Sequence, residues 1–263
     1  MLRKVFLCAL VFLTAFAAAA GEPQKVYRLE EGFVPKGTGE KFVKALVNAL
    51  EPEFMEVTLN AEPLEDGTLS HVHILARGIS AGTEYRLDTA ALTGALVKLT
   101  PPAQWDVANI KTLMPEKWEG LFNIEIVLKE EDARNAVKTY MKSGRDSQKW
   151  RDLSIDFRPG RLVVKGIYDI NSGMRAAFEI TTGLELRQGK QIWLTDTDIQ
   201  INNAEQTDAI RSELKKINPP VDLTELGIPV TLRVLSITDK ELRVRTATAP
   251  QPLDDGIVYR YSK

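Results

Sequence analysis

Few side chains in this sequence offer the chemistry of a catalytic or metal centre. The chain of 263 residues contains two histidines and one cysteine. His71 and His73 are spaced i, i+2 on an expected strand, so both project from the same face. Such a pair can begin a metal site, but a third ligand is needed and no histidine remains to supply it. We therefore interpret the pair as part of a solvated strand face, and we predict no metal and no cofactor.

Signals for catalysis are equally scarce. A Ser-His-Asp triad would have to use one of the two histidines. The sequence has no phosphate-binding loop, no G-x-G-x-x-G fingerprint and no H-E-x-x-H pair. The acidic run Glu130-Glu131-Asp132 lies where a helix is expected to begin, and carboxylates there complement the helix dipole. These observations predict a protein that is not an enzyme.

The N-terminal segment has the pattern of an export signal. Residues 1–20 combine a positively charged start with an apolar run, Val5–Phe16, and small residues that end at Ala20. That run is too short to span a bilayer comfortably. The pattern predicts cleavage near Ala20 and a periplasmic or extracellular location, with an uncleaved anchor as the alternative. Cleavage would remove Cys8, the single cysteine, which suits an oxidising compartment.

Charge is balanced overall but locally uneven. The net charge of −2 and the pI near 5.9 argue against a protein that coats nucleic acid. One basic cluster surrounds a tryptophan, and cations beside an aromatic ring suit anionic lipid headgroups. A solvated helix end and loop is the alternative interpretation. This candidate membrane contact consists of Lys142, Arg145, Lys149, Trp150 and Arg151.

Hydrophobic periodicity divides the rest of the chain into many strands and a few helices. Amphipathic helices are predicted at 40–50, at 130–142 and directly after Asn203. Strands are predicted at 55–59, 68–77, 84–99, 122–128, 153–157, 161–170, 174–186, 191–201, 229–236 and 241–247. A helix is the alternative at 84–99.

No Pro/Gly/Ser-rich linker interrupts residues 40–247, so we expect one domain there. Residues 21–39 are predicted to form a polar arm. Residues 248–263 are predicted to form a loose tail, although Ile257–Tyr259 has the composition of an edge strand.

The length of the strands determines the expected fold. The unbroken alternation at 174–186 would extend about 43 Å. The pattern predicts an α+β fold, in which about three amphipathic helices pack on the apolar concave face of a long curled antiparallel meander sheet. Three short helices cover such a face only partly, which leaves an apolar groove for a hydrophobic ligand. A sandwich that buries its own apolar face is an equally good interpretation of the pattern.

Residues 40–247 as a whole resemble the LmeA-like family of exported bacterial phospholipid-binding proteins. The likeness is carried by the opening helix that leads into 54–79, by ALTGALVKL at 91–99, by KEEDARNAVKTYM at 129–141, by the strand series 153–202 and by 217–247. The last segment, with Asn218-Pro219, is the most specific. The resemblance implies a curled sheet with helices that enclose a lipid, similar in outline to tubular lipid-binding domains. It implies no catalytic residues.

The leading hypothesis is therefore an exported protein that binds phospholipid acyl chains in its own apolar groove and acts in lipid binding or transfer in the cell envelope. A periplasmic scaffold or adaptor with a filled core is the second hypothesis, and a hydrolase with an unrecognised site is the third. The candidate lipid contacts share the apolar face of the expected sheet or a facing helix. They are Phe122, Ile124, Ile126, Val137, Tyr140, Met141, Phe157, Val164, Met174, Phe178, Ile180 and Leu184.

Overall fold

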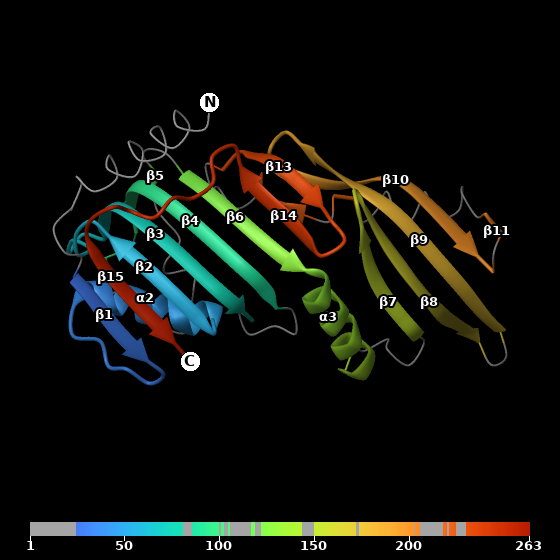
Figure 1. Ribbon diagram of the computed structural model, residues 1–263, viewed down its shortest axis with the longest axis horizontal. Helices are drawn as coiled ribbons and strands as arrows, with labels where there is room; N and C mark the ends of the chain where they lie inside the picture. Colours follow the sequence, from blue (N-terminus) through green and yellow to red (C-terminus); the bar gives the residue numbers. More distant parts are fainter. Residues whose placement is uncertain are drawn as a thin grey trace, which may run out of the picture.

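Two sheets and two helices make up the described part of the chain, which is elongated (Figure 1). The computed structural model describes residues 25–80, 86–99, 101–102, 105, 117–118, 122–143, 150–171, 174–202, 204–205, 218–219, 221–224 and 230–263. Within these ranges, neither helix combines the length and the apolar character needed to cross a bilayer.

The first sheet has nine strands, and all its pairings are antiparallel except the first. Its strands lie in the order β1 (Lys25–Glu30), β15 (Ile257–Ser262), β2 (Phe54–Leu59), β3 (Thr68–Ile79), β4 (Leu87–Lys98), β6 (Phe122–Lys129), β14 (Glu241–Thr246) and β13 (Leu232–Ile237), with β5 (Lys117–Trp118) paired to β4.

The second sheet is an antiparallel meander of six strands. Its order is β11 (Ala204–Glu205), β10 (Gln191–Ile201), β9 (Met174–Arg187), β8 (Arg161–Asn171) and β7 (Trp150–Arg158), with β12 (Val221–Asp222) paired to β10. β9 has 14 residues, so the long strand predicted at 174–186 is confirmed.

Helix α2 (Thr38–Leu50) covers one face of the first sheet. Phe42, Val43 and Leu46 recur at helical spacing and are buried against the sheet, where Met55 and Val57 are also fully buried. We call this cluster the α2 core. Burial of each such side chain contributes about 1.5–3 kcal/mol relative to leaving it exposed. The α2 core therefore holds β1, β15, β2 and β3 to their helix.

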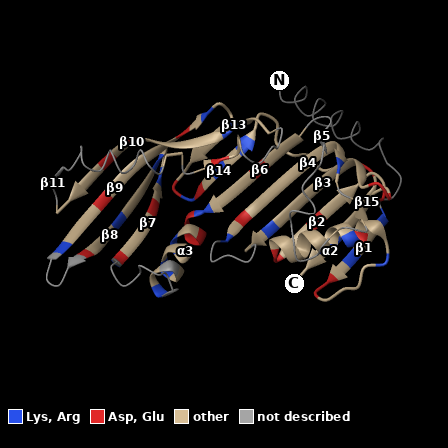
Figure 2. Cartoon of the chain, turned by 180° about the vertical axis from the view of Figure 1, so that it is seen from behind, with Lys and Arg blue, Asp and Glu red and all other residues tan. Residues whose placement is uncertain are grey.

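Helix α3 (Glu130–Ser143) joins the two sheets. It follows β6 without a break and packs chiefly against β7 (Figure 1). A carboxylate oxygen of Glu130 accepts the backbone N–H of Phe157 at 2.6 Å, so the first turn of the helix binds the edge of β7. Figure 2 shows the acidic first turn and the basic last turn of α3, the arrangement that complements a helix dipole.

Two further hydrophobic clusters contain residues of both sheets, and we call them the junction clusters. Ile192, Leu232 and Val244 are buried in the first of them, and Ala133, Phe157 and Ile237 in the second. Backbone bonds support the same junction, because Gly160 N–H donates to the carbonyl of Ile237 at 2.9 Å.

The structure corrects three sequence-based expectations about the elements. The described ranges contain two helices rather than about three. Ala204–Glu205, where the third helix was expected to begin, is strand β11, and the rest of that segment lies outside the described residues. The expected polar arm contributes β1. The expected loose tail contributes β15, which pairs with β1 on one side and β2 on the other.

Candidate functional site

A half-buried apolar face continues across the two sheets. On β6, Phe122, Ile124 and Ile126 alternate with polar residues and are all half-buried. Strand register places Gly94 opposite Phe122 and Leu92 opposite Ile124. The row on β6 is therefore extended by β4 and remains only partly covered.

The second sheet continues this face through β9. Phe122 and Ile124 pack in the same junction cluster as Leu184, which belongs to β9. Ile180 and Phe178 follow Leu184 at even spacing along that strand, so they share its face. All three β9 residues are half-buried. The apolar face thus extends from β6 through Leu184 to Phe178.

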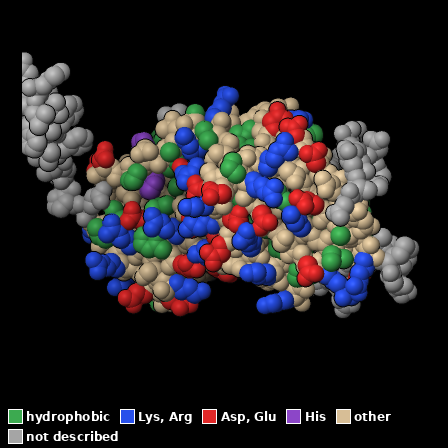
Figure 3. Space-filling view, turned by 45° about the vertical axis from the view of Figure 1, so that its right-hand side comes forward, with side chains coloured by type: hydrophobic (Ala, Val, Ile, Leu, Met, Phe, Trp, Pro, Cys, Tyr) green, Lys and Arg blue, Asp and Glu red, His purple; other side chains and the backbone are tan. Residues whose placement is uncertain are grey.

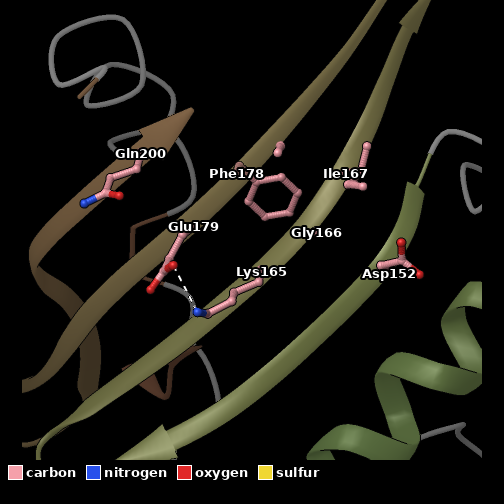
Figure 4. Close-up of a pocket in the computed structure, with 8 residues that line it drawn as sticks. Asp152, Lys165, Gly166, Ile167, Phe178, Glu179 and Gln200 are labelled. Atoms are coloured by element: carbon pink, nitrogen blue, oxygen red, sulfur yellow. Dashed lines mark ion pairs between the residues drawn. The ribbon is translucent and has the colours of Figure 1, made fainter. Parts of the chain in front are cut away.

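Strand register also aligns a row across β8 and β9. Val164 lies opposite Ile180, and both are half-buried. In the next row the ring of Phe178 lies over Gly166, where an added Cβ would be 2.9 Å from the ring carbons (Figure 4). Glycine at 166 therefore gives the aromatic ring its place against the sheet.

The structure describes the side chains of ten of the twelve candidate lipid contacts. Phe122, Ile124, Ile126, Val164, Phe178, Ile180 and Leu184 form the apolar face described above. Val137 and Met141 are half-buried on α3, the helix that packs against β7. Phe157 is 5% exposed and belongs to the packed core of a junction cluster. The side chains of Tyr140 and Met174 lie outside the described part of the structure.

Sequence reasoning missed two residues that complete the face. Leu92 and Ala90 on β4 are half-buried opposite Ile124 and Ile126, and they also pack against the α2 core. Their alternation was visible in the sequence, but pairing with β6 depends on register between strands that are distant along the chain. No sequence signal reports that register directly.

A small pocket of about 280 Å³ lies on the second sheet (Figure 4). Lys165 and Glu179 point toward each other across it and form an ion pair at 3.0 Å. Gln200 lines it from β10 and Asp152 from β7. Its polar lining suits water or a polar group better than an acyl chain.

A second cavity, of about 540 Å³, lies beside α2. Lys44 and Glu51 line it from the helix and its C-terminal end, and Lys263 lines it from the chain end. The lining mixes both signs of charge, so this cavity also lacks the apolar character that an acyl chain requires.

An ion-pair network holds α3 at the junction between the sheets. Arg86 donates to Asp132 at 2.9 Å and to Glu53 at 2.9 Å. The side chain of Asp132 is only 8% exposed, and Arg86 compensates its charge. The same guanidinium holds the pKa of Glu53 below its ordinary value. The start of α3 is therefore tied to the first sheet as well as to β7.

The prediction that both histidines lie on a solvated face is wrong. His71 is exposed, but His73 is 3% exposed and its Nδ1 atom has no hydrogen-bond partner among the residues that the structure describes. Burial lowers the pKa of His73 below the ordinary value for histidine. The hydroxyl of Thr93, which pairs with His73, donates to the carbonyl of Gln251, so the segment before β15 passes over this face (Figure 1).

The described residues offer no metal-binding group. They contain no group of three His, Cys, Asp or Glu side chains placed to hold a metal ion. Gly78 to Gly82 has the G-x-S-x-G spacing of a hydrolase elbow, but that motif requires a strand followed by a helix. Ser80 follows strand β3, but the next described element is the strand β4 and not a helix. The hydroxyl of Ser80 donates to a carboxylate oxygen of Glu51 at 3.0 Å. His73 lies seven residues back on that extended strand, about 23 Å away.

Only part of the basic cluster predicted to contact a membrane can be placed. Lys142 is exposed in the last turn of α3, and Arg151 is paired with Asp169 at 2.8 Å. Arg145, Lys149 and the side chain of Trp150 lie outside the described part of the structure.

Comparison with known proteins identifies a family for this chain. A family model described as LmeA-like phospholipid-binding matches residues 34–247, most of the chain. No curated protein and no solved structure matches the chain.

Proposed function

The chain belongs to the LmeA-like phospholipid-binding family, and from this premise we propose that it holds phospholipid acyl chains against its apolar face. The observation that carries the proposal is incomplete burial. Ile126, Val164 and Ile180 are half-buried and belong to none of the three described core clusters. Apolar surface left in contact with water is unfavourable by about 25 cal/mol per Å². An acyl chain laid on this face would remove that penalty without any change in the strands.

We further propose that the protein acts outside the cytoplasm, in lipid binding or transfer within the cell envelope. The export pattern at residues 1–20 supports this location. The family, which is described by phospholipid binding, supports a carrier rather than an enzyme.

A peripheral contact with anionic membrane through Lys142, Arg145, Lys149, Trp150 and Arg151 is part of the same proposal. Arg151 forms an ion pair with Asp169, which reduces its attraction to anionic lipid. Lys142 is therefore the described residue that should contribute more to membrane binding. This contact is electrostatic and should weaken as salt screens it.

Transfer of a fluorescent phospholipid between vesicles tests the proposal. Ile180→Asp places a charge on the apolar face and should abolish lipid uptake. Ala177→Asp places the same charge on the opposite, exposed face of β9 and should leave uptake unchanged. A protein with a filled core would take up no lipid in any of the three forms, and that result would reject the proposal.

A further inference from the structure

A buried tyrosine with an unused hydroxyl lines the cavity of about 540 Å³ beside α2. Tyr261 is only 4% exposed, and its ring packs against Phe33 with 6.5 Å between the ring centroids. Among the residues that the structure describes, no group forms a hydrogen bond with this hydroxyl. Buried tyrosine hydroxyls usually have a hydrogen-bond partner. The exception at Tyr261 therefore indicates a donor that is available to a ligand in the cavity.

The protonation state of Tyr261 suits a hydrogen-bond donor. Burial, and after it the negative charge of Glu31, raises the pKa of the Tyr261 hydroxyl above the ordinary value for tyrosine. The hydroxyl therefore keeps its proton at neutral pH. The influence of Glu31 also indicates that this carboxylate, which lines the same cavity from the turn after β1, lies near the hydroxyl.

The C-terminal end of α2 makes one end of the cavity electronegative. The last carbonyl groups of a helix carry partial negative charge, and Glu51 adds a carboxylate at the C-cap. The backbone of Glu51 is left-handed, with a φ of 46°, a conformation that glycine usually supplies at this position. A glutamate thus stands where glycine would fit the backbone better. Together with Glu31, it favours a cationic group in the cavity.

Lys44 supplies the opposite charge on the same face of α2. Lys44, Asn48 and Glu51 follow one another at helical spacing and all line the cavity, so Lys44 and Glu51 are about 10 Å apart along the helix axis. The Lys44 ammonium lies 4.8 Å from the centroid of the Phe33 ring, and no carboxylate of the described residues pairs with it. The Asn48 amide offers both a donor and an acceptor between the two charges.

This separation of charge is a local feature of the cavity. On the face that Figure 3 shows, cations and anions are intermixed, and no broad region of one sign is seen there. Arg86 and then Lys263, the other lysine of the lining, lower the pKa of Glu53, so the charge of Lys263 is directed at that carboxylate. A lone anion would be repelled by Glu51 and a lone cation by Lys44. A molecule with both charges can satisfy both groups.

We propose that this cavity binds a small zwitterion in which an ammonium group is joined to a phosphate, with the ammonium beside Glu51 and the phosphate beside Lys44 and the Tyr261 hydroxyl. Charged donors such as lysine are strong partners of phosphate oxygens. The volume of the cavity lies within the range of small-molecule sites, about 300–1,000 Å³. Free esters of phosphoethanolamine and the headgroup of phosphatidylethanolamine share this chemistry. No residue of the apolar face lines the cavity, so the inference goes beyond acyl-chain binding and does not rest on it.

Isothermal titration of the full chain with glycerophosphoethanolamine tests the inference. Glycerol 3-phosphate and ethanolamine serve as probes that each carry one of the two charges. The whole zwitterion should bind at least about tenfold more tightly than either half, because each half lacks one of the two charged contacts.

Variants of the lining test which groups hold the probe. Tyr261→Phe, Lys44→Gln and Glu51→Gly should each weaken binding about tenfold or more. Tyr261→Phe removes a hydroxyl without a partner and Glu51→Gly suits the left-handed backbone, so both should keep a thermal unfolding temperature near that of the wild type. Lys240→Gln and Asp239→Asn make the same changes of charge in the exposed turn between β13 and β14 and should bind as the wild type does.

Vesicles of phosphatidylethanolamine and phosphatidylcholine distinguish the two sources of the ligand. Binding of the chain to these vesicles that glycerophosphoethanolamine displaces would support the site and assign it to a lipid headgroup. Binding of the soluble probe without binding to the vesicles would support the site and assign it to a free zwitterion.

Three results would overturn the inference. They are no binding of glycerophosphoethanolamine, equal binding of the zwitterion and one of its halves, and undiminished binding in all three cavity variants. Ile180→Asp, which tests the apolar face, should bind the zwitterion as the wild type does. Failure of acyl-chain binding and failure of this site therefore give different results.

Discussion

Substitution of Phe178 distinguishes an open apolar face from a packed core. The ring of Phe178 is half-buried, whereas Phe157, in a packed cluster, is 5% exposed. Full burial of a phenylalanine is favourable by about 1.5–3 kcal/mol relative to exposure. Half that burial predicts that Phe178→Ala lowers the free energy of unfolding by about 0.8–1.5 kcal/mol. Phe157→Ala removes a ring from a junction cluster and should cost about 3–5 kcal/mol.

Urea unfolding of both alanine variants gives the comparison, and lipid extraction from the same samples gives the occupancy. Phe178→Asp adds a sharper form of the test, because a carboxylate on a partly exposed face keeps part of its hydration. That variant should stay folded and lose its lipid. A cost at Phe178 that equals the cost at Phe157, or an unfolded Phe178→Asp protein, would show that the ring is packed core and would refute the reasoning.

Three further predictions follow from buried polar groups. Burial lowers the pKa of His73, so below about pH 6.5 the unfolded chain binds more protons than the folded protein and the free energy of unfolding should fall as the pH falls. Urea unfolding at several pH values should show this slope in the wild type and in His71→Gln. Persistence of the slope in His73→Gln would contradict the assignment to His73. Tyr259→Phe removes the hydroxyl that donates to Glu62, and thermal unfolding should show a loss of about 1.5–3 kcal/mol; no loss would mean that this bond does not hold β15. Arg86→Ala leaves a buried carboxylate in the first turn of α3 without its partner and should destabilise the protein by about 3–5 kcal/mol in urea, an effect that would be near zero if water compensates that carboxylate.

Local alternation was sufficient to predict much of the fold. The helix at 40–50 and the long strand at 174–186 both follow from side chains that repeat at the period of their own element, and both are present as α2 and β9. The same reasoning favoured a long strand at 84–99, where the structure has β4 at Leu87–Lys98. In these segments a face is defined by neighbours along the chain, so no knowledge of the partner strand is needed.

The errors arose where distant segments decide the environment. Ile257–Tyr259 has the composition of an edge strand, yet β15, which begins at Ile257, lies inside the first sheet because β1 pairs with its outer side. His73 alternates as a solvent-facing residue would, and it is buried because the segment before β15 crosses its face. The apolar face itself was predicted in part. Its residues on β6 and β9 follow from alternation, whereas the addition of Leu92 and the burial of Phe157 depend on register and on α3.

Mass spectrometry of lipids extracted from the purified protein tests the central claim most directly. The protein is purified without added lipid or detergent, and the Ile180→Asp variant is prepared in parallel as the control for non-specific carry-over. The account predicts phospholipid in defined proportion to the wild-type protein and little or none with Ile180→Asp folded to the same extent. A folded wild type free of lipid, or equal lipid in both proteins, would contradict it.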